Sequence, residues 1–280
     1  MDSQIQINGN SPRAFLRWAG GKSWLVRRIE EIFGNMTFAR YHEPFLGGGS
    51  FFFASATHTV SYLSDKNDAL IETYQSIKDD CESVIERMLV YENSADDYYR
   101  IRASHPSDRF ERAAQFIYLN QTSFNGIYRV NLKGVYNVPY GNRTKNFLDE
   151  DALRSASSGL ALATLRSRDF ADTIDDVKAG DLVFIDPPYT VSHNNNGFIK
   201  YNKSLFSLDD QFRLAEYIQN IRDLGATYIL TNAAHHKIKE IFDVGDRHIE
   251  VSRASLIGGK KAQRGSVSEF IFTNLEAHAS

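Results

Sequence analysis

Four consecutive residues, Asp186-Pro187-Pro188-Tyr189, combine the side chains needed to hold an amino group on a planar ring. They follow the apolar stretch 182–185 directly. The two prolines fix the backbone and remove two amide donors, so acceptors remain: the Asp186 carboxylate and the Pro187 carbonyl. The Tyr189 ring offers a surface on which a heteroaromatic base can stack. Such a string arises by chance on the order of once in a thousand chains, so a simple proline-stiffened turn is the weaker interpretation.

A second candidate group is the glycine turn Gly47-Gly48-Gly49 together with Asp65. Each follows a predicted strand, and Asp65 comes 18 residues after Gly47. This spacing suits an acid that binds ribose hydroxyls at the end of a second strand. The pattern is not GxGxxG, so a nicotinamide dinucleotide fits poorly. Taken alone, a turn plus a capping or surface aspartate explains the pair equally well.

Two other patterns are weaker. The run Ala19-Gly20-Gly21-Lys22-Ser23 superficially resembles a phosphate loop, but Leu16 stands where the first glycine is required, which disfavours a nucleotide triphosphatase. Lys22 at a helix start can still hold an anion such as an amino-acid carboxylate. The pair His235-His236 is better explained as a helix start than as a metal site, because no third ligand lies at useful spacing.

Alternating strands and helices must position these groups. The pattern predicts helices at 23–33, from 50, from a cap at Asn67, and at 208–224, with strands at 41–46, 60–64, 182–185, 227–231, 247–256 and 267–274. This alternation predicts an α/β fold, a doubly wound and mostly parallel sheet with helices on both faces. In such a sheet, ligands bind at the carboxyl ends of the strands, where the candidate groups lie.

The middle of the chain breaks this rhythm with long polar helical stretches and an aromatic, asparagine-rich run at 118–142. We therefore predict an inserted helical subdomain at 79–158, with one catalytic unit formed by 11–78 and 159–280.

Charge is unevenly distributed along the 280 residues, whose net charge is −3. Acid-free basic stretches lie at 11–28, 126–145 and 251–268, whereas 79–97 holds seven acids and one arginine. Each basic stretch alone is most simply a solvated face, but the three together favour an anionic partner. The single cysteine, Cys81, excludes an internal disulfide, and no apolar run approaches the roughly 20 residues of a membrane span. The N-terminus lacks the features of a secretory signal, so a cytoplasmic protein is expected.

The chain resembles the Dam-type DNA adenine-N6 methyltransferases of the D12 class, alpha group. Besides Asp186 to Tyr189, the resemblance is carried by the segments Phe15–Lys22, Glu43–Ser50, Leu63–Asn67, Tyr118–Asn120, Phe124–Arg129 and Asn137–Gly141. It spans nearly the whole chain and implies a Rossmann-like methyltransferase fold in which the inserted subdomain recognises DNA.

The resemblance also implies ligands. S-adenosylmethionine is the expected cofactor, contacted by Trp18, Lys22, Asp65 and Asp186, with Gly47 to Gly49 around its methionine part and Asp169 and Phe170 near its adenine. The residues expected to face DNA are Phe124, Asn125, Arg129, Pro139, Asn142, Arg143 and Lys145. In relatives that methylate GATC, an arginine matching Arg129 reads a guanine, which makes GATC the favoured target.

These expectations combine into a mechanism. The enzyme flips an adenine out of the duplex, Tyr189 stacks on it, and the amino group donates to Asp186 and to the Pro187 carbonyl. The nitrogen lone pair then faces the sulfonium methyl for in-line transfer without a covalent enzyme intermediate. The segment 192–198 is either a polar loop or a lid over the base, and the basic turn with Lys260, Lys261 and Arg264 is a candidate phosphate grip.

The expected partner is double-stranded DNA, without a membrane or a metal, and the protein is expected to be a monomer or weak dimer. Two alternatives stay open. RNA or a protein glutamine can be the substrate, since related motifs begin with Asn-Pro-Pro-Tyr, although Asp186 favours adenine. The other alternative is a DNA-binding protein that has lost catalysis, although such a protein would be expected to carry a damaged motif at Asp186 to Tyr189. Whether the protein belongs to a restriction system, a virus or a housekeeping pathway is open as well.

Overall fold

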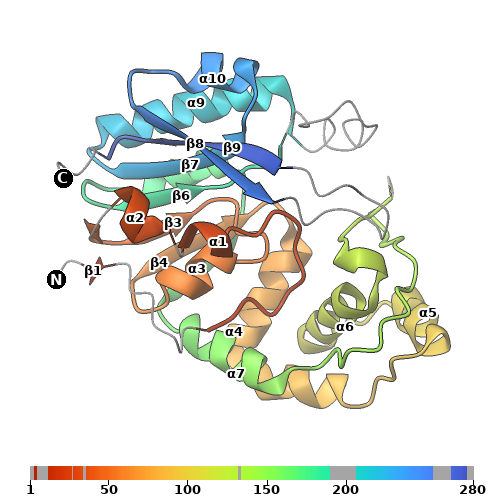
Figure 1. Ribbon diagram of the computed structural model, residues 1–280. Coiled ribbons are helices and arrows are strands. Elements are labelled where there is room, and N and C mark those ends of the chain that lie inside the picture. The colour runs from red at the N-terminus through yellow and green to blue at the C-terminus, as the bar shows by residue number, and fades with distance from the viewer. Residues whose placement is uncertain are drawn as a thin grey trace.

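A seven-stranded sheet forms the centre of the computed structural model, which describes residues 3–4, 12–26, 28–33, 36–131, 134–189, 206–254 and 266–275 (Figure 1). The strand order is β5-β4-β3-β6-β7-β9-β8, and β9 runs antiparallel to both of its neighbours. The other pairings are parallel. The strands are β3 (Tyr41–Glu43), β4 (Ser61–Asp65), β5 (Ala163–Ser167), β6 (Leu182–Ile185), β7 (Thr227–Ala233), β8 (Arg247–Ala254) and β9 (Ser266–Thr273). A separate antiparallel pair joins β1 (Ser3–Gln4) to β2 (Thr37–Phe38).

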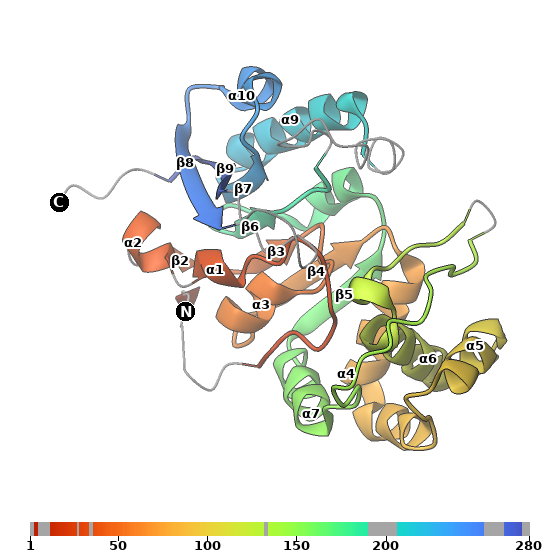
Figure 2. The ribbon, with the colours of Figure 1, turned by 45° about the vertical axis from the view of Figure 1, so that its right-hand side comes forward.

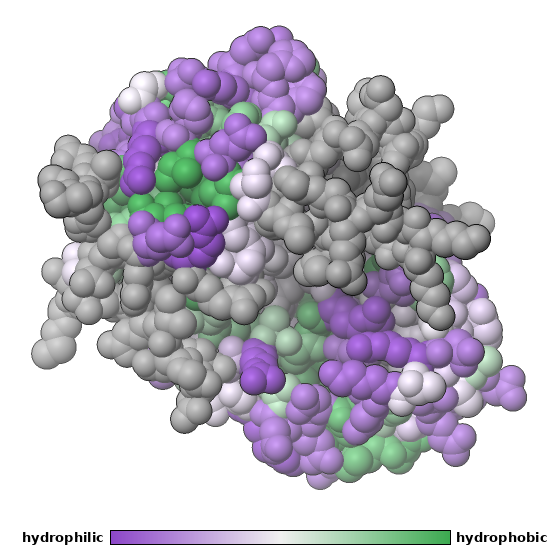
Figure 3. Space-filling model, viewed as in Figure 1, coloured by the Kyte–Doolittle hydropathy of each residue, from purple (hydrophilic) through white to green (hydrophobic). Residues whose placement is uncertain are grey.

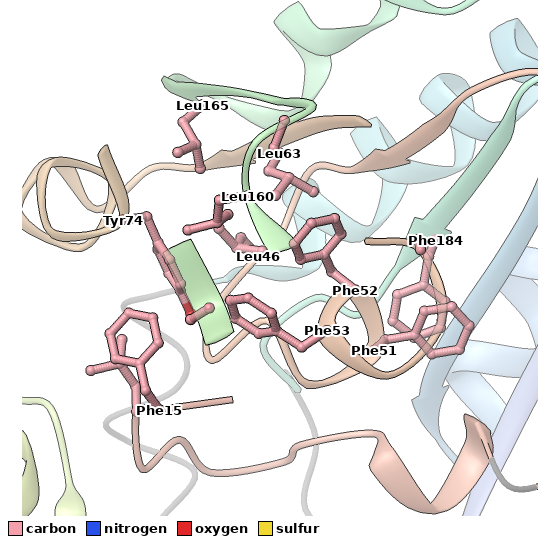
Figure 4. Close-up of a cluster of buried hydrophobic side chains, with 14 of the residues drawn as sticks. Phe15, Leu46, Phe51, Phe52, Phe53, Leu63, Tyr74, Leu160, Leu165 and Phe184 are labelled. Atoms are coloured by element: carbon pink, nitrogen blue, oxygen red, sulfur yellow. The ribbon is translucent and has the colours of Figure 1, made fainter. Parts of the chain in front are cut away.

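The central strand β6 is buried on both faces, which explains its uninterrupted apolar sequence. Leu182 and Phe184 contribute to one hydrophobic cluster, whereas Val183 and Ile185 contribute to the other. Phe184 stacks on Phe51 with ring centroids 3.8 Å apart (Figure 4). Burying one such side chain stabilises the fold by roughly 1.5–3 kcal/mol, so the strand that precedes Asp186 is firmly held.

Helices cover both faces of the sheet (Figure 1). One face is covered by α1 (Ser23–Val26), α2 (Ile29–Phe33), α3 (Ser50–Ser55), α4 (Asp68–Met88) and α7 (Glu150–Gly159). The other face is covered by the short 3-10 helix η2 (Phe170–Asp176), α9 (Leu208–Asp223) and α10 (His236–Phe242). The predicted doubly wound α/β fold is confirmed.

A helical unit stands beside the sheet rather than over it (Figure 2). It contains α5 (Ala95–Ala103), α6 (Arg109–Thr122) and the 3-10 turn η1 (Phe124–Gly126). Tyr98 and Tyr118 are buried in its own small cluster, while α6 also packs against α4. The backbone of Asp80 is non-helical and interrupts α4, close to the predicted beginning of the inserted subdomain. In the view of Figure 3, hydrophilic side chains cover much of this unit, and a hydrophobic area lies at the lower edge, where α4 ends.

The winding of the chain reverses between β3 and β6. These two strands are hydrogen-bonded neighbours, yet β3 is followed by β4 on one side and β6 by β7 on the other. In open α/β sheets, ligands bind in a crevice outside the carboxyl ends of the strands at such a reversal, so we expect the ligand crevice above the ends of β3 and β6. Gly47 follows one of these ends and Asp186 follows the other.

Two predicted elements differ from the structure. The single helix predicted at 23–33 is two short helices, because Arg28 N bonds Leu25 O in a tight turn between α1 and α2. The strand predicted at 41–46 ends at Glu43, since Pro44 has no amide donor with which to continue the ladder. The cap at Asn67 is confirmed, because its side chain accepts a hydrogen bond from Leu70 N at 3.2 Å.

The predicted lid at 192–198 and the basic turn with Lys260, Lys261 and Arg264 lie outside the described residues. Among the helices that the structure describes, none has the length and apolar character needed to cross a bilayer.

Candidate active site

Asp186 lies at the carboxyl end of β6 and forms an ion pair with Lys22. Lys22 Nζ is 2.8 Å from Asp186 Oδ1 and 3.0 Å from Oδ2, and it also donates to Gly20 O at 2.8 Å. Lys22 is almost fully buried, whereas the Asp186 side chain is 21% exposed. The carboxylate therefore has a buried cation behind it and an open side in front.

The ion pair controls the charge of both groups. Burial alone would lower the pKa of Lys22, but the facing Asp186 carboxylate raises it above its ordinary value, so the amine stays charged. Burial raises the pKa of Asp186, and contact with Lys22 opposes that rise. Lys22 therefore favours the ionised, acceptor-only form of Asp186.

Two further residues, from strands that are distant in the sequence, lie next to the Lys22–Asp186 ion pair. Thr231 on β7 donates to Asp186 Oδ1 at 2.7 Å. Glu269 on β9 is fully buried and lies 3.8 Å from Lys22 Nζ. Because β9 is antiparallel, its first residues lie beside the last residues of β7, which brings Glu269 to the edge of the sheet that holds Asp186.

Tyr189 closes one side of the site. Its ring centroid is 5.1 Å from Lys22 Nζ, a cation–π distance, and burial raises the pKa of its hydroxyl. Pro187 is buried and Pro188 is exposed. All four residues of the predicted motif therefore lie at the crevice.

The glycine turn after β3 fits closely under Trp18. Gly47 has a φ of +48°, and a Cβ added there would lie 2.8 Å from Trp18 Nε1. Only glycine therefore combines this backbone conformation with this contact. Tyr74 donates to Gly47 O at 3.0 Å from the neighbouring helix α4. Gly49 also adopts a positive φ, of 63°, where α3 begins.

Asp65 binds the same turn from the neighbouring strand. One carboxylate oxygen accepts from Gly47 N at 3.0 Å and the other accepts from Asn67 N at 3.0 Å. Burial raises the pKa of Asp65, although these two amide donors oppose the rise. The structure therefore joins Gly47 and Asp65, as the strand-end argument predicts, and adds Trp18, which only the family resemblance placed in the site.

A third acid, Glu43, lies beneath the site. It is buried at the end of β3 and accepts a hydrogen bond from Tyr41 Oη at 2.6 Å. Burial raises the pKa of Glu43 to about 8, and the nearby Asp186 charge contributes to the increase. Glu43 is therefore protonated at neutral pH, which spares the site another buried negative charge.

Asp169 and Phe170 lie after β5, near Asp65: Arg168 N donates to Asp65 O at 3.1 Å. Asp169 caps η2 and forms an ion pair with Arg213. Phe170 is buried against Phe45, with ring centroids 5.2 Å apart, so it backs this part of the crevice. Their contact with a cofactor adenine stays a prediction.

The residues predicted to face DNA lie on a separate hairpin. Bridges pair Ser123 with Tyr140 and Val130 with Tyr136, and we call this segment the 123–140 hairpin. The predicted residues lie on the hairpin or directly after it: Phe124, Asn125, Arg129, Pro139, Asn142, Arg143 and Lys145.

Several features of this segment suit contact with a partner. Phe124 is 52% exposed, which is unusual for a phenylalanine. Asn125 and Asn142 adopt positive φ values of 56° and 47°, which non-glycine residues rarely do. The exposed Arg129 side chain donates to Asn137 Oδ1 at 2.7 Å.

Comparison with known proteins identifies the family. Residues 18–255 match the D12 class N6 adenine-specific DNA methyltransferases, which is most of the chain. The chain belongs to this family. It is 34% identical over 283 residues to a Type II methyltransferase of Lactococcus lactis subsp. cremoris, covering 96% of this chain and 98% of that protein. It is 35% identical over 246 residues to a Type II methyltransferase of Methanocaldococcus jannaschii, covering 79% and 84%. It is 29% identical over 265 residues to a DNA adenine methylase of Salmonella typhi, covering 92% and 94%.

As an adenine-specific DNA methyltransferase, the chain must couple its crevice to its hairpin, and Trp18 lies between the two. One side of the indole contacts Gly47, and the ring stacks on Tyr128 of the 123–140 hairpin with centroids 5.8 Å apart at 22°. The preceding residue, Arg17, donates to Gln121 O and Ser123 O, each at 3.2 Å. Two consecutive residues thus join the predicted cofactor side of the methyltransferase to its predicted DNA side.

Several residues of this methyltransferase site were not predicted from the sequence: Glu43, Arg213, Thr231 and Glu269. Tyr128 belongs to the segment Phe124–Arg129 that carries the family resemblance, but its contact with Trp18 was not predicted. Two carried a detectable signal, because Glu43 and Glu269 are acids within predicted strands, Glu43 in 41–46 and Glu269 in 267–274. An acid at such a position requires a partner or a function. Within the part of the chain that the structure describes, no group of three or more His, Cys, Asp or Glu side chains is arranged to hold a metal.

Proposed function

We propose that this methyltransferase transfers the methyl group of S-adenosylmethionine to the N6 of an adenine flipped out of duplex DNA. The observation that carries the proposal is the buried Lys22–Asp186 ion pair, placed at the switch point between the glycine turn and Asp186 to Tyr189. The ion pair favours the ionised form of Asp186, and the nearby Gly47 and Asp65 have the spacing that suits a nucleoside.

The residues fit the proposed cofactor. The missing Cβ of Gly47 lets the Trp18 indole pack directly on the turn, and this packed turn can line the side that receives the methionine part. Asp65 lies at the neighbouring strand end, where its carboxylate can accept from the ribose hydroxyls. When bound, S-adenosylmethionine supplies an activated methyl group on a sulfonium.

The chain's own residues then position the amine. Asp186 and the Pro187 carbonyl accept hydrogen bonds from the two amino protons, which orients the nitrogen lone pair away from them. Lys22 stays behind Asp186 and keeps it charged, while the Tyr189 ring stacks on the base. Positive charge that develops on the nitrogen is stabilised by the Asp186 carboxylate. As the N–C bond forms, the C–S bond of the donor would break to leave a neutral thioether, and the methylated nitrogen would release one of its two protons to solvent.

Flipping is required because the target nitrogen lies inside the duplex. We propose that residues 79–158 recognise DNA while 11–78 and 159–280 carry catalysis. The exposed Phe124 suits stacking on bases, and the Arg129 guanidinium suits bidentate pairing with a guanine. GATC is the target we favour, with Pro139, Asn142, Arg143 and Lys145 near the backbone. We further propose a monomer or weak dimer acting in the cytoplasm, where the free Cys81 fits a reducing environment.

Expression in a host without adenine methylation tests the proposal. Sequencing host DNA with adenine-modification detection should show N6-methyladenine at one short motif, and GATC is the expected one. Purified protein should bind S-adenosylmethionine in a calorimeter. Unmodified host DNA together with no cofactor binding would overturn the assignment, whereas modification at another motif would overturn only the choice of GATC.

A further inference from the structure

Asp169 uses only one of its two carboxylate oxygens for firm contacts. Oδ1 accepts from Ala171 N at 3.0 Å and from Arg213 Nη2 at 2.7 Å. Oδ2 is faced by Lys66 Nζ at 3.6 Å, beyond hydrogen-bond distance, and the Lys66 side chain is 83% exposed. Among the described residues, Oδ2 therefore has only this loose ion pair, and since the Asp169 side chain is partly exposed it keeps the capacity to accept from a ligand.

Arg213 is held in place from three directions. Nη1 lies 2.8 Å from Asp210 Oδ1, Nη2 contacts Asp169, and the guanidinium lies 4.9 Å from the centre of the Phe170 ring. Asp210 is itself fixed, because it forms a capping box with Ser207 at the start of α9. An isolated surface ion pair is mobile and contributes little, but a planar guanidinium with three anchors has a defined orientation.

We propose that Arg213 is a positioning residue that orients Asp169 so that Oδ2 accepts a hydrogen bond from the adenine amine of the methyl donor. The inference rests on the proposed function. Arg213 occupies Oδ1 and fixes the plane of the carboxylate, while Phe170 beneath it supplies the apolar wall. A site that offers a charged acceptor to an amine rejects a ring lacking that donor, because the acceptor is then left without its partner.

The test compares two ligands by calorimetry: S-adenosylhomocysteine and its analogue with hydrogen in place of the 6-amino group. The wild-type protein should prefer the amine by about 10- to 100-fold, the range for a hydrogen bond to a charged group. Arg213→Gln should reduce this preference to about threefold or less, chiefly by weakening the amine ligand. Arg213→Lys keeps the charge without the planar fork and should retain only part of the preference.

Arg222→Gln is the matched control. Arg222 also lies on α9 and forms an ion pair, with Nε 3.2 Å from Asp246, but it does not contact Asp169. This variant should keep the wild-type preference, and all variants should show the wild-type thermal midpoint within a few degrees. If Arg213→Gln weakens both ligands equally or neither, the positioning role is overturned while the proposed function stands. If the wild-type protein binds neither ligand, the proposed function fails, and this inference fails with it.

Discussion

Two aspartates flank the same four-residue strand, and the protein shifts their pKa values in opposite directions. Asp181 precedes β6 and Asp186 follows it. Both lie next to a cation and both are removed from bulk water, yet the surroundings lower the pKa of one and raise the pKa of the other. What distinguishes them is how completely their oxygens are satisfied.

Asp181 is fully enclosed by partners. Arg40 binds both of its oxygens, at 3.0 and 2.6 Å, and His42 Nε2 lies 2.8 Å away. Lys178 N donates a further bond at 2.8 Å. Burial alone would raise the pKa of Asp181, but the hydrogen bonds from His42 and Arg40 lower it below its ordinary value. At this end of the strand, the aspartate stabilises the fold by holding Arg40, His42 and the backbone of Lys178 together.

Asp186 has fewer donors and an open side. Lys22 and Thr231 bind it from within the protein, while 21% of the side chain remains exposed. The comparison teaches that burial and an ion pair do not identify a functional acid. A functional acid keeps acceptor capacity for a group that is still to arrive.

The largest expected effect at the open end is that of Lys22→Met. Without the ammonium, burial raises the pKa of Asp186 further, so the acid becomes protonated and stops accepting from an amine. Methyl transfer at pH 7 should fall at least about 100-fold and should recover partly as pH rises, since higher pH ionises Asp186 again. A pH–rate profile measures this, and a loss that is the same at every pH would argue against the role given to Lys22.

At the enclosed end, Asp181→Asn should damage stability rather than chemistry. The amide leaves Arg40 and His42 without their carboxylate, which should lower the free energy of unfolding by about 2–4 kcal/mol. Urea denaturation measures the loss. The rate per folded molecule should stay near that of the wild type, and a selective loss of rate would mean that Asp181 also serves the chemistry.

Glu43 provides a test by pH, because burial raises its pKa from the ordinary 4.5 to about 8. Between these values the folded protein keeps a proton that the unfolded chain releases, so wild-type stability falls as pH rises through this window. Glu43→Gln cannot release that proton. Its stability relative to the wild type should therefore increase by about 3–4 kcal/mol between pH 5 and pH 8.5. A stability difference that does not change with pH would show that Glu43 is ionised in the folded protein.

The smallest expected effect concerns the stacking of Trp18 on Tyr128, which joins the 123–140 hairpin to the site at the Asp186 end of β6. No such contact is found among the described residues at the Asp181 end. Tyr128→Ala removes the ring that stacks on Trp18, and cofactor affinity should fall about 3- to 10-fold, as expected for one aromatic pair. Tyr128→Phe keeps the ring and should bind like the wild type. Calorimetry with S-adenosylhomocysteine measures the affinities. Equal affinities for the alanine and phenylalanine variants would show that the stacking of Trp18 on Tyr128 does not support cofactor binding.

Much of this architecture is predictable from local sequence. The alternation of strands and helices predicts the doubly wound sheet, because each apolar period reflects which face is buried. The strand-end rule then brings Gly47, Asp65 and Asp186 together, since the carboxyl ends of parallel strands share one edge. The break between α1 and α2 is not predictable from the local pattern. Leu25 and Phe33 both lie in the hydrophobic core, and the helical period alone does not show that the chain must turn between them.

The contacts of the remaining site residues could not be predicted for a different reason. Glu269 reaches Lys22 only because β9 inserts antiparallel between β7 and β8, and this register is a long-range property. Tyr128 meets Trp18 across 110 residues of sequence, and Arg213 meets Asp169 across 44. Local spacing carries no information about either contact. The long-range ion pair of Lys22 with Asp186 was likewise not foreseen, although both residues were expected in the site.

The most direct test of the central claim is single-turnover transfer of a labelled methyl group to duplex DNA by the wild type and by Asp186→Asn. Asparagine keeps an acceptor for Thr231 but removes the charge that faces the buried Lys22, so the thermal midpoint should fall by several degrees. The two rates are therefore compared per folded, cofactor-bound molecule, at a temperature where both proteins are folded. The account predicts label in N6-methyladenine from the wild type and a rate at least about 1,000-fold lower from Asp186→Asn. Label in RNA or protein instead of DNA, or an equal rate from Asp186→Asn, would contradict it.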